Sequence, residues 1–153
     1  MKKSFLLSLL FSNIAFSPNA QVKKCATLES AISTFINYPE ITKWLKRDSN
    51  IKSDSIVFFV DLGNIIKQPF MNTWIGCKIN FVNDKLLIDS LKHFQPHFVL
   101  KNRPNYFVLI SWNESPKATA IMLLHAFNNM SGEATIVHKG KFYLITKIKS
   151  GVL

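Results

Sequence analysis

The fold class is decided by residues 119–148, which read TAIMLLHAFNNMSGEATIVHKGKFYLITKI. β-branched, aliphatic and aromatic side chains dominate residues 119–127, 132–138 and 141–148, and residues 128–130 and 139–140 form short polar breaks between them. Strands joined by such short connections must be antiparallel, because a parallel pair needs a longer crossover. The stretch therefore predicts a β-meander, and simple alternation in its last strand puts Tyr143, Ile145 and Lys147 on one face.

Further strands are predicted upstream of this meander. Residues 106–111 extend it by one strand, and residues 56–60, IVFFV, are too apolar on both faces for an edge strand, so they predict a central or doubly covered one. Residues 75–81 alternate as a half-buried strand with Ile75 and Cys77 on the same face. Residues 83–84, Asn-Asp, then begin either a tight hairpin or a short helix through Leu91, and the sequence leaves both open.

Helical spacing comes before the strands. Thr27 is a suitable N-cap for a helix whose apolar positions follow the i, i+4, i+7, i+8 pattern, and Pro39 ends that helix and begins a second one. Their predicted apolar faces are formed by Leu28, Ile32, Phe35 and Ile36 in the first helix and by Ile41, Trp44 and Leu45 in the second. Helices followed by antiparallel strands predict an α+β fold, with N-terminal helices packed on a curved antiparallel sheet.

The N-terminus reads as an export signal. Lys2 and Lys3 precede an apolar run over residues 5–11, and small residues follow it up to Ala20. Residues 1–20 are therefore predicted to be a cleaved signal peptide, with a cut after Ser17 as the alternative to a cut after Ala20. Residues 21–153 would then form one domain in a secreted or periplasmic protein, since no later apolar stretch is long enough to cross a bilayer.

The chain is strongly basic. It carries 19 Lys and Arg residues against 9 acids, a formal net charge of +10, and removal of the two leader lysines leaves 17 against 9, or +8. Only Arg47 and Arg103 are arginines. This charge favours anionic partners such as a lipid or glycan surface. The scarcity of arginine and of basic clusters argues against specific nucleic-acid binding.

Cys25 and Cys77 are the two cysteines of the chain. In an oxidising compartment they predict a single disulfide, which would stabilise the fold by roughly 4 kcal/mol through closure of a long loop. The alternative is that Cys77 is a buried thiol and Cys25 is free. The chain has no Cys-x-x-Cys, which disfavours a cysteine zinc site or thiol-exchange chemistry.

At the level of element order, residues 27–148 resemble the cystatin-like and nuclear-transport-factor-like cone folds. The likeness consists of one N-terminal helical layer followed by a meander that ends in two long strands paired around Gly140. The break at Pro39 departs from a version with one unbroken helix. The resemblance implies a curved sheet closed by a helix, and it carries no functional residue across.

Catalytic and cofactor signatures are missing from the sequence. None of the five glycines belongs to a phosphate loop, a dinucleotide fingerprint or a nucleophile elbow, so no cofactor is predicted. Pro96 interrupts the i, i+4 pair His93 and His97, which argues against a metal site on one helix face. A small hydrolase or isomerase remains a rival reading, in which His125 or His138 acts with Asp61 or Glu114.

A binding module with no catalytic role is the leading hypothesis. Its predicted ligand-binding residues are Trp74, Tyr106, Trp112 and His125, at the mouth of the curved sheet. The partner would be a small apolar ligand or a protein. A second rival is a basic effector or envelope-binding protein, which requires one patch made of Lys43, Lys46, Arg47, Lys139, Lys141, Lys147 and Lys149.

Overall fold

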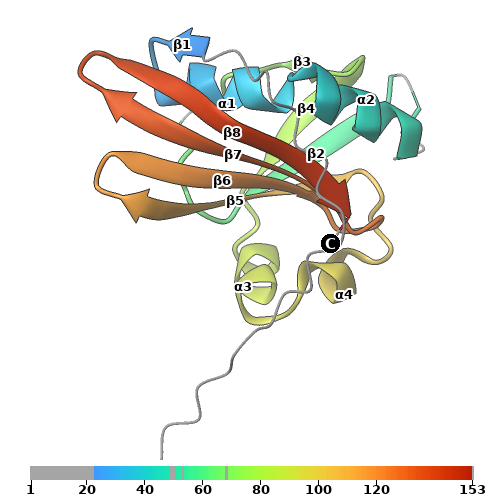
Figure 1. Cartoon of the computed structure of the whole chain (residues 1–153). Coiled ribbons are helices and arrows are strands. Elements are labelled where there is room, and N and C mark those ends of the chain that lie inside the picture. The colour runs from blue at the N-terminus through green and yellow to red at the C-terminus, as the bar shows by residue number, and fades with distance from the viewer. Residues whose placement is uncertain (1–22, 49–50, 53, 68, 153) are drawn as a thin grey trace, which may run out of the picture.

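The computed structural model describes residues 23–48, 51–52, 54–67 and 69–152, so the predicted leader lies outside the described residues. The described chain forms one curved, open sheet with helices on both faces (Figure 1). This confirms the predicted α+β class. None of the helices in these ranges has the length and apolar character that a membrane crossing requires.

Eight strands make up the sheet of the described chain, in the order β1-β8-β7-β6-β5-β2-β4-β3. Four helices accompany them: α1 (Leu28–Ile36), α2 (Pro39–Asp48), α3 (Lys85–His93) and α4 (Pro96–Leu100). The strands are β1 (Lys23–Cys25), β2 (Ile56–Asp61), β3 (Thr73–Trp74), β4 (Cys77–Val82), β5 (Tyr106–Ser115), β6 (Ala118–His125), β7 (Met130–Lys139) and β8 (Phe142–Val152).

The meander from β5 to β8 is confirmed, with three successive antiparallel pairs. Gly140 makes the β7–β8 turn at φ 60°, a left-handed conformation that glycine adopts without steric cost. The β7–β8 register shifts between Glu133 and Thr135, and Lys147 has φ 53°. Because of this irregularity Lys147 lies on the face opposite to the buried Ile145, so the simple alternation predicted for this strand is wrong at Lys147.

β2 is a central strand, as its apolar sequence predicts, and it pairs in parallel with both β4 and β5. The chain leaves β4, forms α3 and α4, and returns to the sheet as β5 on the other side of β2. A helical crossover of this kind is what parallel pairing requires. As a result, the carboxyl ends of β2 and β4 lie at the same end of the sheet.

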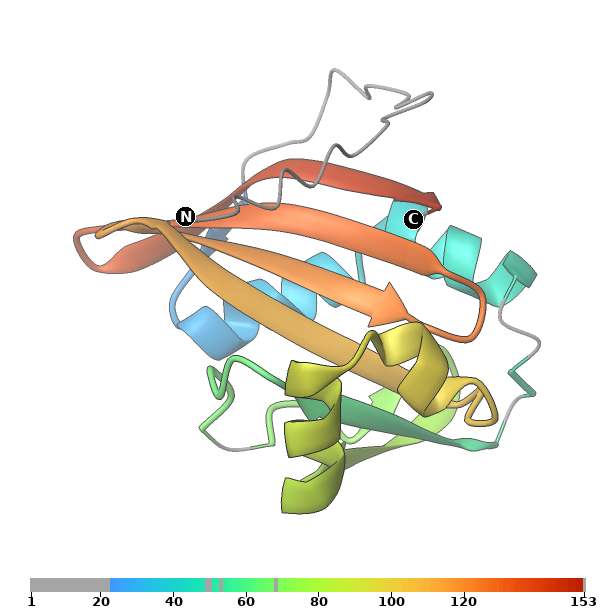
Figure 2. The same ribbon diagram turned by 90° about the horizontal axis from the view of Figure 1, so that it is seen from below.

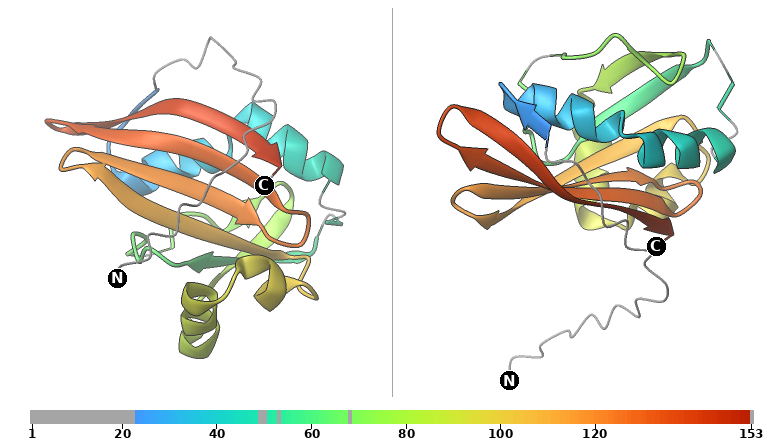
Figure 3. Two further views of the ribbon diagram at one scale, coloured as in Figure 1. Left: turned by 60° about the horizontal axis from the view of Figure 1, so that its bottom comes forward. Right: turned by 45° about the horizontal axis from the view of Figure 1, so that its top comes forward.

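α1 and α2 cover one face of the sheet (Figure 3, right). Thr27 caps α1 in a capping box: its side chain accepts a hydrogen bond from the N–H of Ser30, and the Ser30 hydroxyl accepts one from the N–H of Thr27. α2 approaches β7 closely, since a Cβ placed on Gly132 would lie 2.5 Å from Cδ1 of Ile41. The core on this face includes the buried residues Ala31, Ile32, Phe35, Ile36, Ile41, Phe59, Trp74, Phe107, Ile121, Leu123 and Ile136.

α3 and α4 pack on the opposite face (Figure 2). Of the hairpin and the helix predicted as alternatives after residues 83–84, the helix forms. Asp84 caps α3, because its side chain accepts hydrogen bonds from the N–H groups of Leu86 and Leu87. α3 ends at His93, before Pro96 begins α4, as the proline predicts. The smaller core beneath these helices is made of Val60, Leu87, Leu91, Leu100, Val108, Leu124 and Ala126.

The strand predicted over residues 75–81 begins later than expected. Ile75 and Gly76 both have positive φ, at 48° and 84°, and form the tight turn between β3 and β4. Positive φ at both central residues is the backbone of a two-residue hairpin turn. Ile75 is therefore a turn residue and does not share a strand face with Cys77.

The predicted disulfide is absent from this structure, in which Cys25 and Cys77 are both buried free thiols. Sγ of Cys25 lies 3.6 Å from Oγ1 of Thr34, and Sγ of Cys77 lies 3.5 Å from the carbonyl oxygen of Lys52. Each thiol therefore has its own local polar contact. Burial also raises the pKa of the Cys77 thiol, which disfavours the reactive thiolate.

Candidate functional site

The four residues predicted to bind a ligand do not form one site. Side chains alternate along β5, so Tyr106 and Trp112 lie on the face opposite to Phe107. Trp74 is 2% exposed, and its Nε1 donates a 3.0 Å hydrogen bond to the carbonyl oxygen of Ile36. Its ring meets Phe107 edge-on, with centroids 5.0 Å apart. Trp74 is therefore a core residue.

His125 belongs to the same core, where its ring stacks on Phe107 at a centroid distance of 4.7 Å. The residue is 1% exposed, and Nε2 bonds to the carbonyl oxygen of Pro104. This bond requires the proton on Nε2, since a carbonyl oxygen only accepts. Burial lowers the pKa of His125, and the bond to Pro104 opposes part of that effect. His125 is thus held as a neutral, structural imidazole.

Tyr106 and Trp112 lie apart from that core. Tyr106 is half-buried and stacks on Phe58, with the guanidinium of Arg103 5.1 Å from its ring centroid. Trp112 is 43% exposed on the open part of the sheet, where it borders a shallow depression of about 140 Å³ that Glu114 and Lys147 also line. Of the four predicted residues, only Trp112 has substantial access to solvent at a hollow.

The acid–base pairs required by the enzymatic reading do not form among the described residues. His138 stacks on Tyr143, with ring centroids 4.7 Å apart, and Glu114 accepts a 3.2 Å hydrogen bond from Thr135. His93 and His97 each contact a backbone carbonyl oxygen, of Asp89 and Ala126 respectively. The described residues also contain no group of three or more His, Cys, Asp or Glu placed to hold a metal ion.

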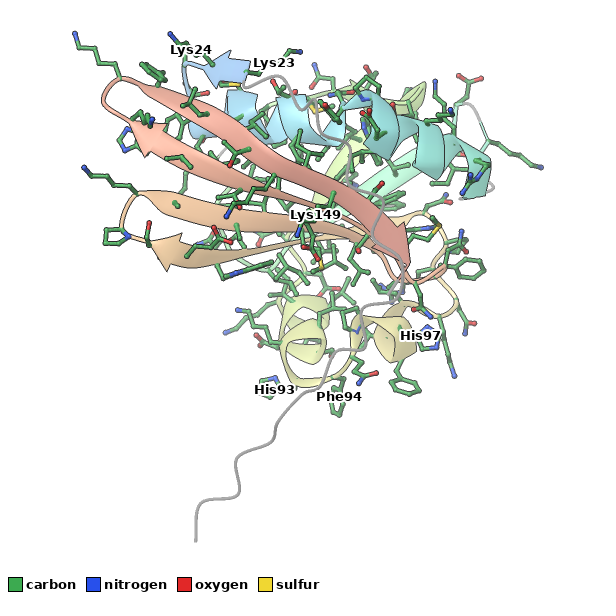
Figure 4. All side chains as sticks on the ribbon, viewed as in Figure 1. Lys23, Lys24, His93, Phe94, His97 and Lys149 are labelled. Atoms are coloured by element: carbon green, nitrogen blue, oxygen red, sulfur yellow. The ribbon has the colours of Figure 1, made fainter. Side chains whose placement is uncertain are left out.

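The seven cations of the predicted basic patch are divided among three places. Lys139 and Lys141 flank the β7–β8 turn, and Lys147 lines the depression beside Trp112. α2, which carries Lys43, Lys46 and Arg47, lies at the other end of the sheet from the β7–β8 turn (Figure 1). Lys149, which is labelled in Figure 4, also lines the depression. One patch of these seven residues is therefore not formed.

A cleft of about 480 Å³ lies at the carboxyl ends of β2 and β4. In open sheets with parallel strands, this end is where ligands commonly bind. α3 forms one side of the cleft through Ile88 and Lys92. The complete lining is Phe59, Asp61, Leu62, Asn64, Ile66, Lys67, Phe81, Val82, Asn83, Ile88 and Lys92.

Asp61 organises the loop that borders this cleft. Its Oδ1 accepts a 3.1 Å bond from the N–H of Gly63, and its Oδ2 accepts a 2.8 Å bond from the N–H of Ile66. Burial raises the pKa of Asp61, while the backbone bonds to its carboxylate oppose the rise. Both carboxylate oxygens are thus engaged by the loop itself. Lys67 closes it by donating a 3.0 Å bond from Nζ to the carbonyl oxygen of Asn64.

The charges in the cleft favour an anion. Lys67 and Lys92 contribute two ammonium groups, whereas Asp61 is the one acid in the lining and its oxygens accept backbone bonds. An ammonium has three donors, so the single bond from Lys67 to Asn64 leaves it further capacity. Apolar side chains such as Ile66, Phe81 and Ile88 share the walls with these polar groups. The arrangement therefore suits a molecule with an apolar body and one anionic group.

Sequence reasoning missed Lys67, Lys92, Asn64 and Asn83 as candidate binding residues. The available signal was the polar residues that follow two apolar strands, Asp-Leu-Gly-Asn over 61–64 and Asn-Asp over 83–84. Those segments meet only because β2 and β4 are parallel neighbours. The sequence predicted antiparallel pairs, which gave no reason to join the two strand ends.

Comparisons of the chain with protein-family models, with curated proteins and with solved structures find no match.

Proposed function

We propose that this chain is an exported, non-catalytic binding protein, and that its ligand is a small molecule with an apolar body and one anionic group. The observation that carries this proposal is the 480 Å³ cleft between β2, β4 and α3. Its size lies in the range of small-molecule sites. That the protein is exported rests on the leader predicted over residues 1–20. The resemblance of the sheet to the cone folds is likewise part of this proposal.

The lining gives the expected roles. Phe81, Ile66 and Ile88 would contact the apolar body, since each contributes an aliphatic or aromatic side chain to the wall. Lys67 and Lys92 would neutralise the anionic group from the loop after β2 and from the last turn of α3. Asp61 would act indirectly, because its bonds to Gly63 and Ile66 hold the loop that positions Lys67.

The test is a titration of the ¹⁵N-labelled protein with decanoate, followed by amide chemical shifts. We expect shifts that cluster at Asn64, Lys67, Asn83 and Lys92. Decylamine and decan-1-ol share the apolar chain and lack the anion, so each should bind at least about tenfold more weakly, which corresponds to roughly 1.4 kcal/mol. Equal binding of decylamine would contradict the anionic assignment.

A charge variant provides the matched control. Replacing Lys67 and Lys92 by Gln should weaken decanoate binding by about tenfold or more, because it removes both cations of the cleft. The same change at Lys139 and Lys141, which flank the β7–β8 turn, should leave it unaltered. Shifts that map outside the cleft in the parent protein would reject this site.

A further inference from the structure

A second surface, independent of the cleft, is formed by exposed phenylalanines at the corner between α3 and α4. Phe94 is 67% exposed, Phe98 is 66% exposed, and Phe127 in the β6–β7 turn is 42% exposed. At about 200 Å² per side chain, these rings present on the order of 350 Å² of aromatic surface. This area is within the range of the largest apolar patch on a monomeric soluble protein, and such a patch is often functional.

The fold brings the three rings to one region. The ring of His97, next to Phe98, lies 3.4 Å from the carbonyl oxygen of Ala126, the residue before Phe127. Phe94 caps α3 in extended backbone, and Pro96 then starts α4, so Phe94 stands at the junction of the two helices. Figure 4 shows Phe94 and His93 at the outer edge of this corner, directed away from the sheet.

The segment that carries Phe94 and Phe98 has more cations than acids. From the start of α3 to Arg103 the cations are Lys85, Lys92, Lys101 and Arg103 and the one acid is Asp89, and the turn at 126–129 adds no acid. Lys101 and Arg103 are exposed. Aromatic rings flanked by cations are typical of proteins that rest on an anionic bilayer, where the rings enter the headgroup region and the cations meet the lipid charge.

The shape of the corner favours a bilayer over a peptide or a small ligand. α3 and α4 project below the sheet as a convex corner (Figure 1), and Phe94, Phe98 and Phe127 line neither the cleft nor the depression beside Trp112. A concave groove is the usual site for a peptide or small molecule, whereas a convex aromatic corner fits an extended, deformable surface. We propose that the α3–α4 corner docks this protein on anionic phospholipid membranes.

The experiment is co-sedimentation of the purified protein with vesicles of phosphatidylglycerol and phosphatidylcholine, with pure phosphatidylcholine vesicles alongside. We expect binding to the anionic vesicles that weakens as salt is raised. The double variant Phe94→Ser/Phe98→Ser should bind about tenfold or more weakly, since two rings no longer enter the interface. Trp112→Ser, which removes an exposed ring from the open sheet face, is the matched control and should bind like the parent.

Three further arms separate this proposal from its rivals. Phe98→Trp should keep parental binding, because tryptophan is favoured at bilayer interfaces. Lys101→Gln/Arg103→Gln should weaken binding several-fold, and Lys139→Gln/Lys141→Gln should not. Glycerol 3-phosphate in solution should fail to displace the protein, which separates a lipid surface from a free phosphate. Absence of vesicle binding, or parental binding by Phe94→Ser/Phe98→Ser, would overturn the proposal; neither result bears on decanoate in the cleft.

Discussion

The face of the sheet under α1 and α2 differs from the face under α3 and α4 in how completely it is covered. On the first face Trp74, Phe107 and His125 are packed ring against ring and are at most 2% exposed. On the second face the helices cover β2 and part of the meander, and Trp112 remains 43% exposed on the uncovered part. Residues of the same type thus have opposite roles on the two faces.

The unequal covering of the two faces separates structural aromatic residues from accessible ones. The first face holds most of the large buried side chains, so its aromatic residues stabilise the fold. The second has a smaller core, borders the cleft beside α3, and carries the exposed rings of Phe94 and Phe98. A set of aromatic residues selected from sequence alone therefore contains both buried residues that stabilise the fold and exposed residues that can bind a partner.

The largest expected effect contrasts the two tryptophans. Trp74→Ala should lower the free energy of unfolding by about 3–5 kcal/mol, because it leaves a cavity beside Phe107 and an unpaired carbonyl at Ile36. Trp112→Ala should change it by about 0.5 kcal/mol or less. Urea denaturation of both variants provides the measurement, and similar losses would mean that the two faces are equally important for stability.

A second prediction concerns the close approach of α2 to β7. Gly132→Ala should cost about 1–3 kcal/mol of stability, because its Cβ would meet Cδ1 of Ile41 at 2.5 Å. Ile41→Val removes that methyl group and should recover part of the loss in the double variant. A double-mutant cycle measures the coupling, and strictly additive losses would show that α2 does not pack against Gly132.

The third prediction concerns pH and His125. Burial lowers the pKa of this group in the folded protein, so the unfolded chain binds a proton more readily between that lowered pKa and about 6.5. The free energy of unfolding should therefore fall as the pH drops below about 6.5, with a contribution of at most about 1.4 kcal/mol per pH unit.

His125→Phe isolates this contribution, because it preserves a ring stacked on Phe107 and removes the titrating group. Because the variant lacks the hydrogen bond to Pro104, its free energy of unfolding should be about 1 kcal/mol lower near neutral pH. Its stability should also depend less on pH than that of the parent. The exposed histidines His93, His97 and His138 are present in both proteins. An unchanged slope in denaturation curves between about pH 7 and 5 would assign the titration elsewhere.

The smallest expected effect is that of reductant on the two thiols. Since Cys25 and Cys77 are free, dithiothreitol should leave the unfolding midpoint unchanged. Mass spectrometry after alkylation of the unfolded, unreduced protein should find two modified cysteines. If dithiothreitol instead lowered the free energy of unfolding by roughly 4 kcal/mol, the disulfide predicted from the sequence would be present.

Local patterns accounted for most of the elements and for few of the site residues. The cap at Thr27 and the break at Pro39 were predictable because capping bonds and proline restraint act within a few residues. The turn at Ile75 was not, since a β-branched residue at positive φ goes against local preference. The cleft was missed because its lining comes from three separate segments, around residues 59–67, 81–83 and 88–92.

Local sequence features were enough to predict the α+β class, the helix boundaries around Pro39 and the antiparallel meander, because periodicity, prolines and short turns restrict the chain locally. Tertiary packing establishes that β2 pairs in parallel on both sides, that Trp74 and Trp112 have different environments, and that Lys67 and Lys92 line the same cleft. Strand order and helix placement depend on contacts between distant segments. Those contacts are selected by the burial of the whole chain, which no short stretch of sequence encodes.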